Sequence, residues 1–339
     1  RRRSQMFSKT CVLSKIVATG SRLTYQWSRQ KVERKGSSRM TMLVHAVGHV
    51  QIGVSDVAAV VRDATQILGL RITHTGAGET WLSANGRAAE VVLRHDRENA
   101  ARVIGFEILS ADGVREAAAR VESAGCRIVA TQPSLACIAE SVTFATPEGL
   151  VFEFHTPVRD ELYGRRYQMT GVGANRMDHF NVISPDPIAT RTQLERVGGL
   201  RLSERLVNDS LSWMYGGNRQ HHILGIVKGV VGLHHYSFEM QDFTSYLKLG
   251  DLLDRADKQL VWGPGRHRPG DNTYAYYLDA SGCMVECSGA MASIADDAGF
   301  EANVITNLAR PGNVRAMNVW GTPAPLEWRE HHFPFARID

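Results

Sequence analysis

Four segments of the chain repeat one pattern, and this repeat constrains the fold more than any other feature of the sequence. The segments are GHVQIGVSD, GFEILSAD, DHFNVISPD and HHYSFEMQD, and each alternating apolar run ends in an aspartate. The matching positions are His49, Gly105, His179 and His235, each seven residues before that aspartate. The interval is 56 residues within each pair of segments and 130 residues from the first pair to the second. Such spacing predicts one unit present in four copies.

Each copy predicts the same order of elements. The alternating run favours a strand, because successive side chains of a strand point to opposite faces. A helical pattern follows it in every copy: DVAAVVRDATQILG, DGVREAAARVESAG, DPIATRTQLERVGG and DFTSYLKLGDLLDRA. We expect the aspartate to cap the first turn of each helix. Three short strand-like runs, separated by Gly, Pro or Asn, come after it. The prediction is therefore an α+β fold in which four βαβββ modules pair into two domains.

The repeat also predicts the domain boundaries. We expect a basic leader that is disordered or not native, a non-catalytic first domain, a linker, a catalytic second domain and a tail that wraps back or covers another part of the chain. These segments are residues 1–41, 42–157, 158–176, 177–290 and 291–339, in that order.

Charge and composition restrict the partners. Residues 1–40 hold 11 of the 39 basic and one of the 35 acidic residues, which leaves 28 basic and 34 acidic residues for the rest. The body is therefore mildly acidic, and we expect no nucleic-acid partner. No apolar run approaches the roughly 20 residues of a membrane-spanning helix, so we expect no membrane segment. The leader reads either as a transit peptide or as sequence upstream of a start at Met40 or Met42. Five cysteines without a CxxC pair indicate reduced thiols and a cytoplasmic location.

Two histidines at equivalent positions of neighbouring modules suggest a metal site. His179 and His235 lie on first strands that can pair side by side, so both can face one cavity. His234 is one residue out of phase and is expected to point away and to pack or hydrogen-bond behind. Glu286 lies in the last strand, GCMVECSG, where a carboxylate is costly unless it is paired or bound to a metal. Two imidazoles and one carboxylate are the ligands of non-haem Fe(II) oxygenases.

The first domain provides an internal comparison. Its equivalent positions are His49, Gly105 and Glu153. A glycine has no side chain to offer as a ligand, so the full set of three is predicted in the second domain only.

At these residues the sequence resembles a known family. The stretch GPGRHRPGDNTYAYYLDASGCMVE resembles the signature of two-domain type I extradiol ring-cleavage dioxygenases, which belong to the vicinal oxygen chelate superfamily and share the glyoxalase-like fold. The resemblance covers about residues 43–290. It departs from the family pattern at Ala280, usually a proline, and at Ala275, usually a large apolar residue. The resemblance implies cleavage of a catechol ring beside its diol by O₂, at Fe(II) or alternatively Mn(II), in aromatic catabolism.

The resemblance also implies roles for individual residues. His221, fourteen residues before the second metal histidine, matches the acid–base histidine, and His222 is the alternative and a substrate-binding candidate. Trp213 matches an aromatic wall of the substrate pocket. His267 and Tyr276 match residues that hydrogen-bond the catechol oxygens.

Partners and rival functions follow from the same resemblance. A catecholic substrate, O₂, a homo-oligomer and a cytoplasmic location are the family expectations. No arginine pair stands out as a clamp for a substrate carboxylate, although Arg266 and Arg268 flank His267, and this favours an alkyl- or aryl-substituted catechol. The rival functions are a metal-dependent glyoxalase-like lyase or isomerase and an inactive binding protein of the same fold.

Overall fold

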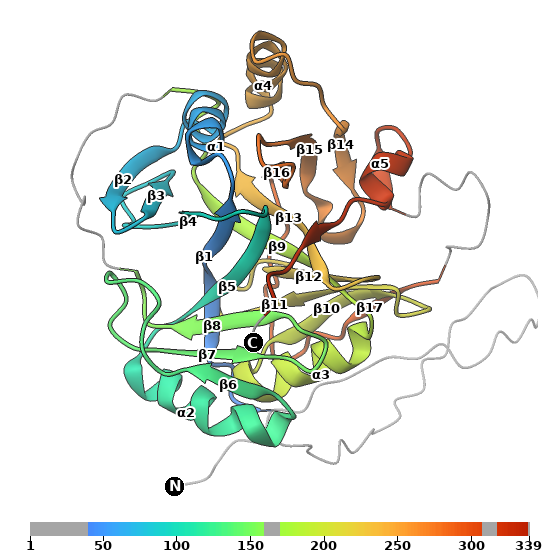
Figure 1. Ribbon diagram of the computed structural model, residues 1–339. Coiled ribbons are helices and arrows are strands. Elements are labelled where there is room, and N and C mark those ends of the chain that lie inside the picture. The colour runs from blue at the N-terminus through green and yellow to red at the C-terminus, as the bar shows by residue number, and fades with distance from the viewer. Residues whose placement is uncertain (1–39, 159–169, 307–316, 338–339) are drawn as a thin grey trace, which may run out of the picture. The chain divides into compact units, whose positions relative to one another are not determined.

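The computed structural model describes residues 40–158, 170–306 and 317–337. The predicted leader up to residue 39 and most of the predicted linker lie outside these residues. The four predicted βαβββ modules are all present, so the α+β fold class is confirmed (Figure 1).

The first two modules form one eight-stranded sheet, in the order β2-β3-β4-β1-β5-β8-β7-β6. The first module consists of β1 (Val44–Val54), α1 (Val57–Asp63), β2 (Arg71–Gly76), β3 (Glu79–Ser83) and β4 (Val91–His95), with a π-helical turn at Ala64–Leu68. The second consists of β5 (Ala100–Ile108), α2 (Ala111–Val121), β6 (Arg127–Ala130), β7 (Ser141–Ala145) and β8 (Val151–His155), with a 3₁₀ turn at Glu122–Ala124.

The last two modules form the core of a second sheet with the equivalent order β10-β11-β12-β9-β13-β16-β15-β14. The third module consists of β9 (Arg176–Ser184), α3 (Pro187–Gly198), β10 (Arg201–Leu206), β11 (Leu211–Tyr215) and β12 (Leu224–Lys228). The fourth consists of β13 (Gly232–Glu239), α4 (Thr244–Arg255), β14 (Trp262–His267), β15 (Thr273–Leu278) and β16 (Met284–Gly289), with a 3₁₀ turn at Pro269–Asp271.

The tail adds further elements to the second sheet. They are β17 (Asn303–Ile305), β18 (Asn318–Trp320), α5 (Leu326–Arg329) and β19 (Phe333–Pro334). Strand β17 pairs with β10, β18 pairs with β14, and β19 pairs with β13.

The helix starts follow the predicted aspartates in part. Asp56 and Asp186 are the N-caps of α1 and α3, and the side chain of each accepts a hydrogen bond from a backbone N–H of the first turn. The prediction is wrong for α2, where Ser110 is the N-cap and Asp112 lies inside the first turn. A serine hydroxyl satisfies the free N–H groups of the first turn as well as a carboxylate does, so Ser110 begins the helix two residues earlier.

The pairing of the first strands brings distant residues together. Strand β9 lies antiparallel to β13, and β16 lies parallel to β13 with Glu286 opposite Ser237. Three neighbouring strands therefore carry the three predicted ligands.

Both ligand-bearing first strands contain a β-bulge. On β13 the register shifts between Leu233 and His235, which leaves His234 as the extra residue. On β9 the shift places Asp178 and His179 opposite Ser237. A bulge breaks the alternation of side chains along a strand, so a residue next to a ligand can approach that ligand.

Among the described residues, no helix is long and apolar enough to cross a membrane.

Candidate metal centre

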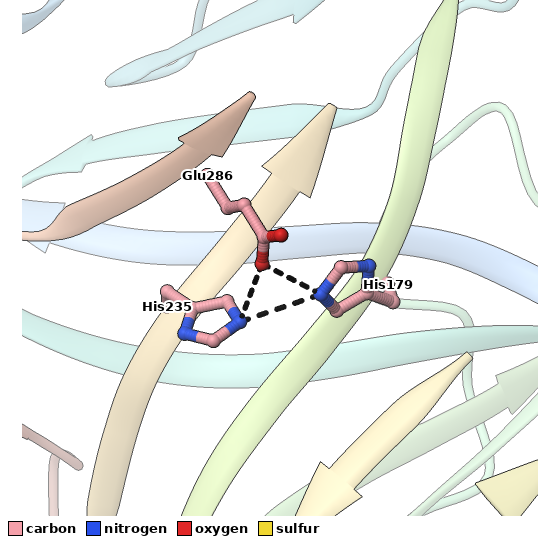
Figure 2. Close-up of side chains that lie close together, drawn as sticks. All are labelled: His179, His235 and Glu286. Atoms are coloured by element: carbon pink, nitrogen blue, oxygen red, sulfur yellow. Dashed lines mark hydrogen bonds and ion pairs between the residues drawn. The ribbon is translucent and has the colours of Figure 1, made fainter. Parts of the chain in front are cut away.

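Three buried donor atoms meet at the predicted site (Figure 2). Nε2 of His179 lies 3.0 Å from Oε2 of Glu286, and Nε2 of His235 lies 3.1 Å from the same oxygen. The two nitrogens are 3.3 Å apart. A divalent ion about 2.1 Å from each donor would separate neighbouring ligands at right angles by about 3 Å. The spacing therefore fits one face of an octahedral ion.

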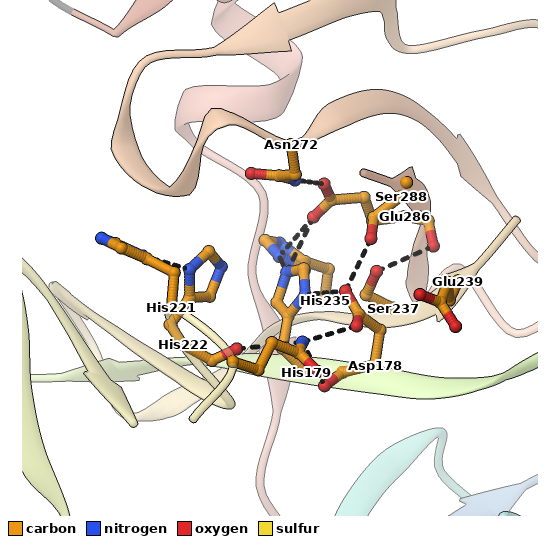
Figure 3. Close-up of polar contacts among 12 residues, drawn as sticks. Asp178, His179, His221, His222, His235, Ser237, Glu239, Asn272, Glu286 and Ser288 are labelled. Carbon is orange, nitrogen blue, oxygen red and sulfur yellow. Dashed lines mark hydrogen bonds and ion pairs between the residues drawn. The ribbon is translucent and has the colours of Figure 1, made fainter. Parts of the chain in front are cut away.

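The first histidine is held from behind by a carboxylate. Oδ2 of Asp178 accepts a hydrogen bond from Nδ1 of His179 at 2.9 Å. The same carboxylate also accepts a hydrogen bond from the Ser288 hydroxyl at 2.6 Å (Figure 3). A further hydrogen bond comes to it from the Gln220 amide at 2.5 Å. Since Nδ1 of His179 carries the hydrogen in this contact, its Nε2 is free to donate a lone pair to a metal.

The second histidine is held by a chain of two hydrogen bonds. Nε2 of His234 lies 2.8 Å from the backbone carbonyl of Trp328, which can only accept, so His234 donates there. Nδ1 of a neutral His234 is then an acceptor, and Nδ1 of His235 donates to it at 2.7 Å. This leaves the lone pair of His235 Nε2 directed at Glu286. As expected, His235 lines the cavity, while His234 lies outside its lining and hydrogen-bonds to His235 from behind.

The donor set favours a cation. Burial would raise the pKa of Glu286, but the charge and hydrogen bonds of His179 and His235 lower it well below its usual range. Burial would lower the pKa of His179, but Glu286 and Asp178 together raise it to about 9. Without a metal, the site therefore retains one proton among its three acceptors. A metal would displace that proton, and the residues present fit a divalent ion.

The structure places His222, rather than His221, in the cavity wall. The ring of His222 is 4.6 Å from that of His179, centroid to centroid. His221 lies behind it, with the two Nδ1 atoms 3.0 Å apart, and its Nε2 lies 3.5 Å from Oε2 of Glu204. Gly270 has φ +75°, and an added Cβ there would lie about 3 Å from both rings, so this turn requires glycine.

His267 and Tyr276 form a hydrogen-bonded pair at the cavity. Nδ1 of His267 lies 3.3 Å from Oδ1 of Asn318, whose amide nitrogen donates to the Thr322 carbonyl. His267 therefore donates through Nδ1, and its Nε2 accepts from the Tyr276 hydroxyl at 2.9 Å. Burial lowers the pKa of His267 to about 4, so the ring is neutral.

The cavity brings together seven of the eight predicted site residues. His221 is the one outside its lining. The described residues that line it are His179, Asn181, Leu211, Trp213, His222, Gly225, His235, His267, Pro269, Asn272, Tyr276, Glu286, Met317 and Trp328.

Two asparagines of this lining were not predicted from the sequence. Asn181 follows His179 by two positions on β9, and this spacing is the signal that it shares the face of the ligand. Asn272 donates from Nδ2 to Oε1 of Glu286 at 3.1 Å. The other oxygen, Oε2, faces Nε2 of His179 and of His235. Asn272 lies in a turn, where no periodic signal exists.

The first domain holds two of the three equivalent residues. Nε2 of His49 lies 3.3 Å from Oε2 of Glu153. A Cβ on Gly105 would lie 2.5 Å from Nδ1 of His49, which has no hydrogen-bond partner. Gly48 stands where the second domain has Asp178, and the ring of His155 fills the adjacent space. Within the described ranges, only the second domain brings three possible metal ligands together.

Comparisons with known proteins agree with this architecture. The model of the Glyoxalase/Bleomycin resistance protein/Dioxygenase superfamily matches residues 46–154. Metapyrocatechase from Pseudomonas sp. strain CF600 is 25% identical over 265 residues, which cover 71% of this chain and 85% of that protein.

Two solved structures share the fold. The Mn(II)-bound glyoxalase from Novosphingobium aromaticivorans has a TM-score of 0.75 and 25% identity, covering 88% of this chain and 97% of that one. The substrate complex of homoprotocatechuate 2,3-dioxygenase from Brevibacterium fuscum has a TM-score of 0.76 and 21% identity, covering 87% and 94%. Residues 46–154 thus match the glyoxalase, bleomycin resistance protein and dioxygenase superfamily, and the chain is homologous to metapyrocatechase.

Proposed function

We propose that the protein is an extradiol dioxygenase, which cleaves the ring of a catechol beside its diol and places both atoms of O₂ in the product. The observation that carries this proposal is the convergence of His179, His235 and Glu286 on one point in the cavity wall. These three residues would hold a divalent ion and would leave room on it for substrate and O₂. The similarity to metapyrocatechase supports the same reaction.

The metal is Fe(II) in this proposal, with Mn(II) as the alternative. Two imidazoles and a carboxylate suit either ion, and the glyoxalase of similar fold is described with Mn(II). When present, the ion would be chelated by the two adjacent hydroxyls of the substrate. It would lower their pKa and supply the redox chemistry.

The residues around the cavity have separate tasks. His222 takes a proton from the diol and returns it when the ring opens, because its ring faces the cavity and lies beside that of His179. Burial and the charges of His179 and His221 lower its pKa well below the usual value, so the ring is neutral before a substrate binds. His221 steadies this ring through the Nδ1 contact and does not itself meet the substrate.

The second pair stabilises the bound diol. The Tyr276 hydroxyl and the His267 imidazole are hydrogen-bonded to each other beside Glu286, with His267 Nε2 4.0 Å from Oε1 of Glu286. When a catechol anion binds, the Tyr276 hydroxyl can turn its hydrogen from His267 Nε2 to a catechol oxygen, while the two rings exclude water from it.

The substrate in this proposal is a catechol with an apolar substituent. Leu211, Trp213 and Met317 line the cavity, and no lysine or arginine is among its described lining residues. An acid-bearing catechol would bring a buried carboxylate without a cationic partner, which is costly. The buried free thiols of Cys126, Cys283 and Cys287 support a reducing, cytoplasmic location, and a homo-oligomer is proposed from the family resemblance.

The test is O₂ uptake by protein reconstituted anaerobically with Fe²⁺ or Mn²⁺. The substrates tested are catechol, 3-methylcatechol, 2,3-dihydroxybiphenyl and homoprotocatechuate. O₂ consumption is measured with an oxygen electrode, and product formation is measured by yellow absorbance. We expect uptake with yellow product from at least one apolar catechol and less from the acid. His235→Ala should abolish both signals, while the matched first-domain variant His49→Ala should retain them. Bound metal without any uptake would sink the dioxygenase proposal and favour the lyase.

A further inference from the structure

The two ligand histidines are supported by different parts of the chain. His179 is held by Asp178, and Asp178 is held in turn by Ser288 and Gln220, all within residues 176–289. His235 is held by His234, and His234 is held by a backbone carbonyl of α5, 94 residues further along the chain. One ligand of the candidate metal centre therefore depends on the tail.

The tail residue that accepts this hydrogen bond also lines the cavity. The indole of Trp328 lies 4.7 Å from the ring of His234, 4.8 Å from that of Trp262 and 5.7 Å from that of Tyr276, centroid to centroid. The Trp328 carbonyl thus accepts a hydrogen bond from His234, and Trp328 also belongs to the lining of the cavity.

The chain next to Trp328 is docked on the strand that carries the ligand. Strand β19 pairs with β13 at Gly232 and Leu233, directly before His234. A Cβ on Gly232 would lie 2.7 Å from both His332 and the Phe333 carbonyl, so this approach requires glycine. Nε2 of His332 lies 2.9 Å from the Val231 carbonyl, which also ties the tail to this strand.

The end of the described tail reaches the first domain. Phe335 forms a bridge with Ala101 of β5, and the backbone N–H of Ala336 donates to the Ala101 carbonyl at 2.8 Å. The segment 326–336, here called the strap, therefore contacts the ligand strand, the cavity and the first domain.

We propose that Trp328 is a positioning residue of the metal centre. Its carbonyl holds His234, and His234 holds His235 in the tautomer and orientation that leave Nε2 free to bind a metal. Docking of the strap and binding of the metal then stabilise each other, because coupling between two equilibria is reciprocal. This inference rests on the proposed function only in requiring a bound divalent ion, and catechol chemistry is not part of it.

Metal affinity gives the first test. His234→Phe keeps an aromatic ring against Trp328 but removes both nitrogens. We expect the Kd for Mn²⁺ to rise about 10–100-fold, as is typical when the partner of a metal-bound histidine is lost. His234→Asn keeps an acceptor close to Nδ1 of His235 and should recover part of the affinity, which a loss of packing alone would not allow. Circular dichroism verifies that each variant is folded.

Hydrogen exchange gives the second test, which does not depend on activity. In the native protein, saturating Mn²⁺ should slow amide exchange in the strap several-fold. In the His234→Phe variant, Mn²⁺ at a concentration that saturates this variant should not slow amide exchange in the strap. Asp178→Asn is the matched control, because it weakens the other support but leaves the Trp328 contact, so its strap should still respond.

The outcomes separate the two proposals. A native Kd in His234→Phe, or a strap that responds to metal equally in that variant, would overturn the role of Trp328. A native protein that binds Mn²⁺ without any change in the strap would overturn this inference alone. A native protein that binds no divalent ion would overturn the inference and the proposed function together.

Discussion

Three of the four histidines that line the cavity have their Nδ1 atom hydrogen-bonded by the residue just before them, while the fourth, His267, is held by Asn318. The pairs are Asp178 with His179, His221 with His222 and His234 with His235. In a regular strand such neighbours would point to opposite faces, and the bulges in β9 and β13 remove that restriction for the two ligands. For His179 and His235 the contact fixes which nitrogen carries the hydrogen, and therefore which one can face a metal.

The first prediction distinguishes the two histidines at the acid–base position. His222→Gln should lower kcat about 10²–10⁴-fold, the usual contribution of a proton-transfer residue, with metal content unchanged. His221→Gln should lower kcat less than about tenfold, since the amide can still hold the His222 ring. Steady-state O₂ uptake measures both. A larger loss in His221→Gln than in His222→Gln would contradict the assignment.

The convergence of His179, His235 and Glu286 could be predicted from the sequence, but which of His221 and His222 lines the cavity could not. His179, His235 and Glu286 occupy positions set by the repeat and by strand alternation, which are local properties of the chain. The choice of His221 depended on counting fourteen residues back from His235. That count assumes a fixed length for the loop between β12 and β13, and loop length varies freely on a conserved framework.

A second prediction concerns His155, a buried histidine of the first domain. Burial and the charge of His49 lower its pKa to about 3, whereas an unfolded chain has a value of about 6.5. As the pH falls below about 6.5, the unfolded state therefore binds a proton that the folded state refuses, and stability is lost. Between pH 7.5 and 5 the loss from this group should be about 2 kcal/mol.

Urea unfolding at the two pH values, compared between the native protein and His155→Gln, measures this contribution. The variant should lose less stability on acidification. Equal losses in both proteins would mean that His155 titrates alike in the folded and unfolded states.

At the scale of elements, equivalent strands of the two domains differ in side-chain size at the positions around the site. On β1 the residue before the histidine is Gly48, and on β5 the ligand position is Gly105. The space that these glycines leave is filled by the rings of His49 and His155, 5.0 Å apart between centroids. The first domain keeps the strand pattern of the second, but its equivalent site is packed with side chains.

A third prediction follows from this packing. Gly105→Ala would place a Cβ 2.5 Å from Nδ1 of His49 and 3.0 Å from Nε2 of His155. Overpacking a rigid core typically costs about 1–3 kcal/mol, and we expect that loss in the free energy of unfolding with no change in metal content. Gly250→Ala in α4 is the control, because an added Cβ meets nothing within 4 Å and alanine favours a helix. Destabilisation by Gly250→Ala, or none by Gly105→Ala, would contradict this account.

The tail shows which elements the sequence did not predict. Strands β17, β18 and β19 have two or three residues each, too few for a periodic pattern to be recognised. Their pairing is decided by contacts with β10, β14 and β13, which are distant in the sequence. The contact of Trp328 with His234 depends on this pairing. No sequence pattern near Trp328 predicts the contact.

At the scale of the whole molecule, duplication provides two similar domains of which one carries the candidate metal centre. The four modules and their pairing could be predicted because the repeat is present in the sequence itself. That three possible metal ligands meet in the second domain alone, among the described residues, could be predicted from a single position, since Gly105 stands where the second domain has His235. The account therefore requires one metal ion per chain.

The most direct test of this claim is the metal content of three proteins after reconstitution with Fe²⁺ or Mn²⁺ and gel filtration. Glu286→Gln removes the carboxylate of the candidate centre, and Glu153→Gln makes the same change at the equivalent position of the first domain. We predict about one ion per chain in the native protein and in Glu153→Gln, and almost none in Glu286→Gln. A full ion retained by Glu286→Gln, or one lost from Glu153→Gln alone, would contradict the central claim.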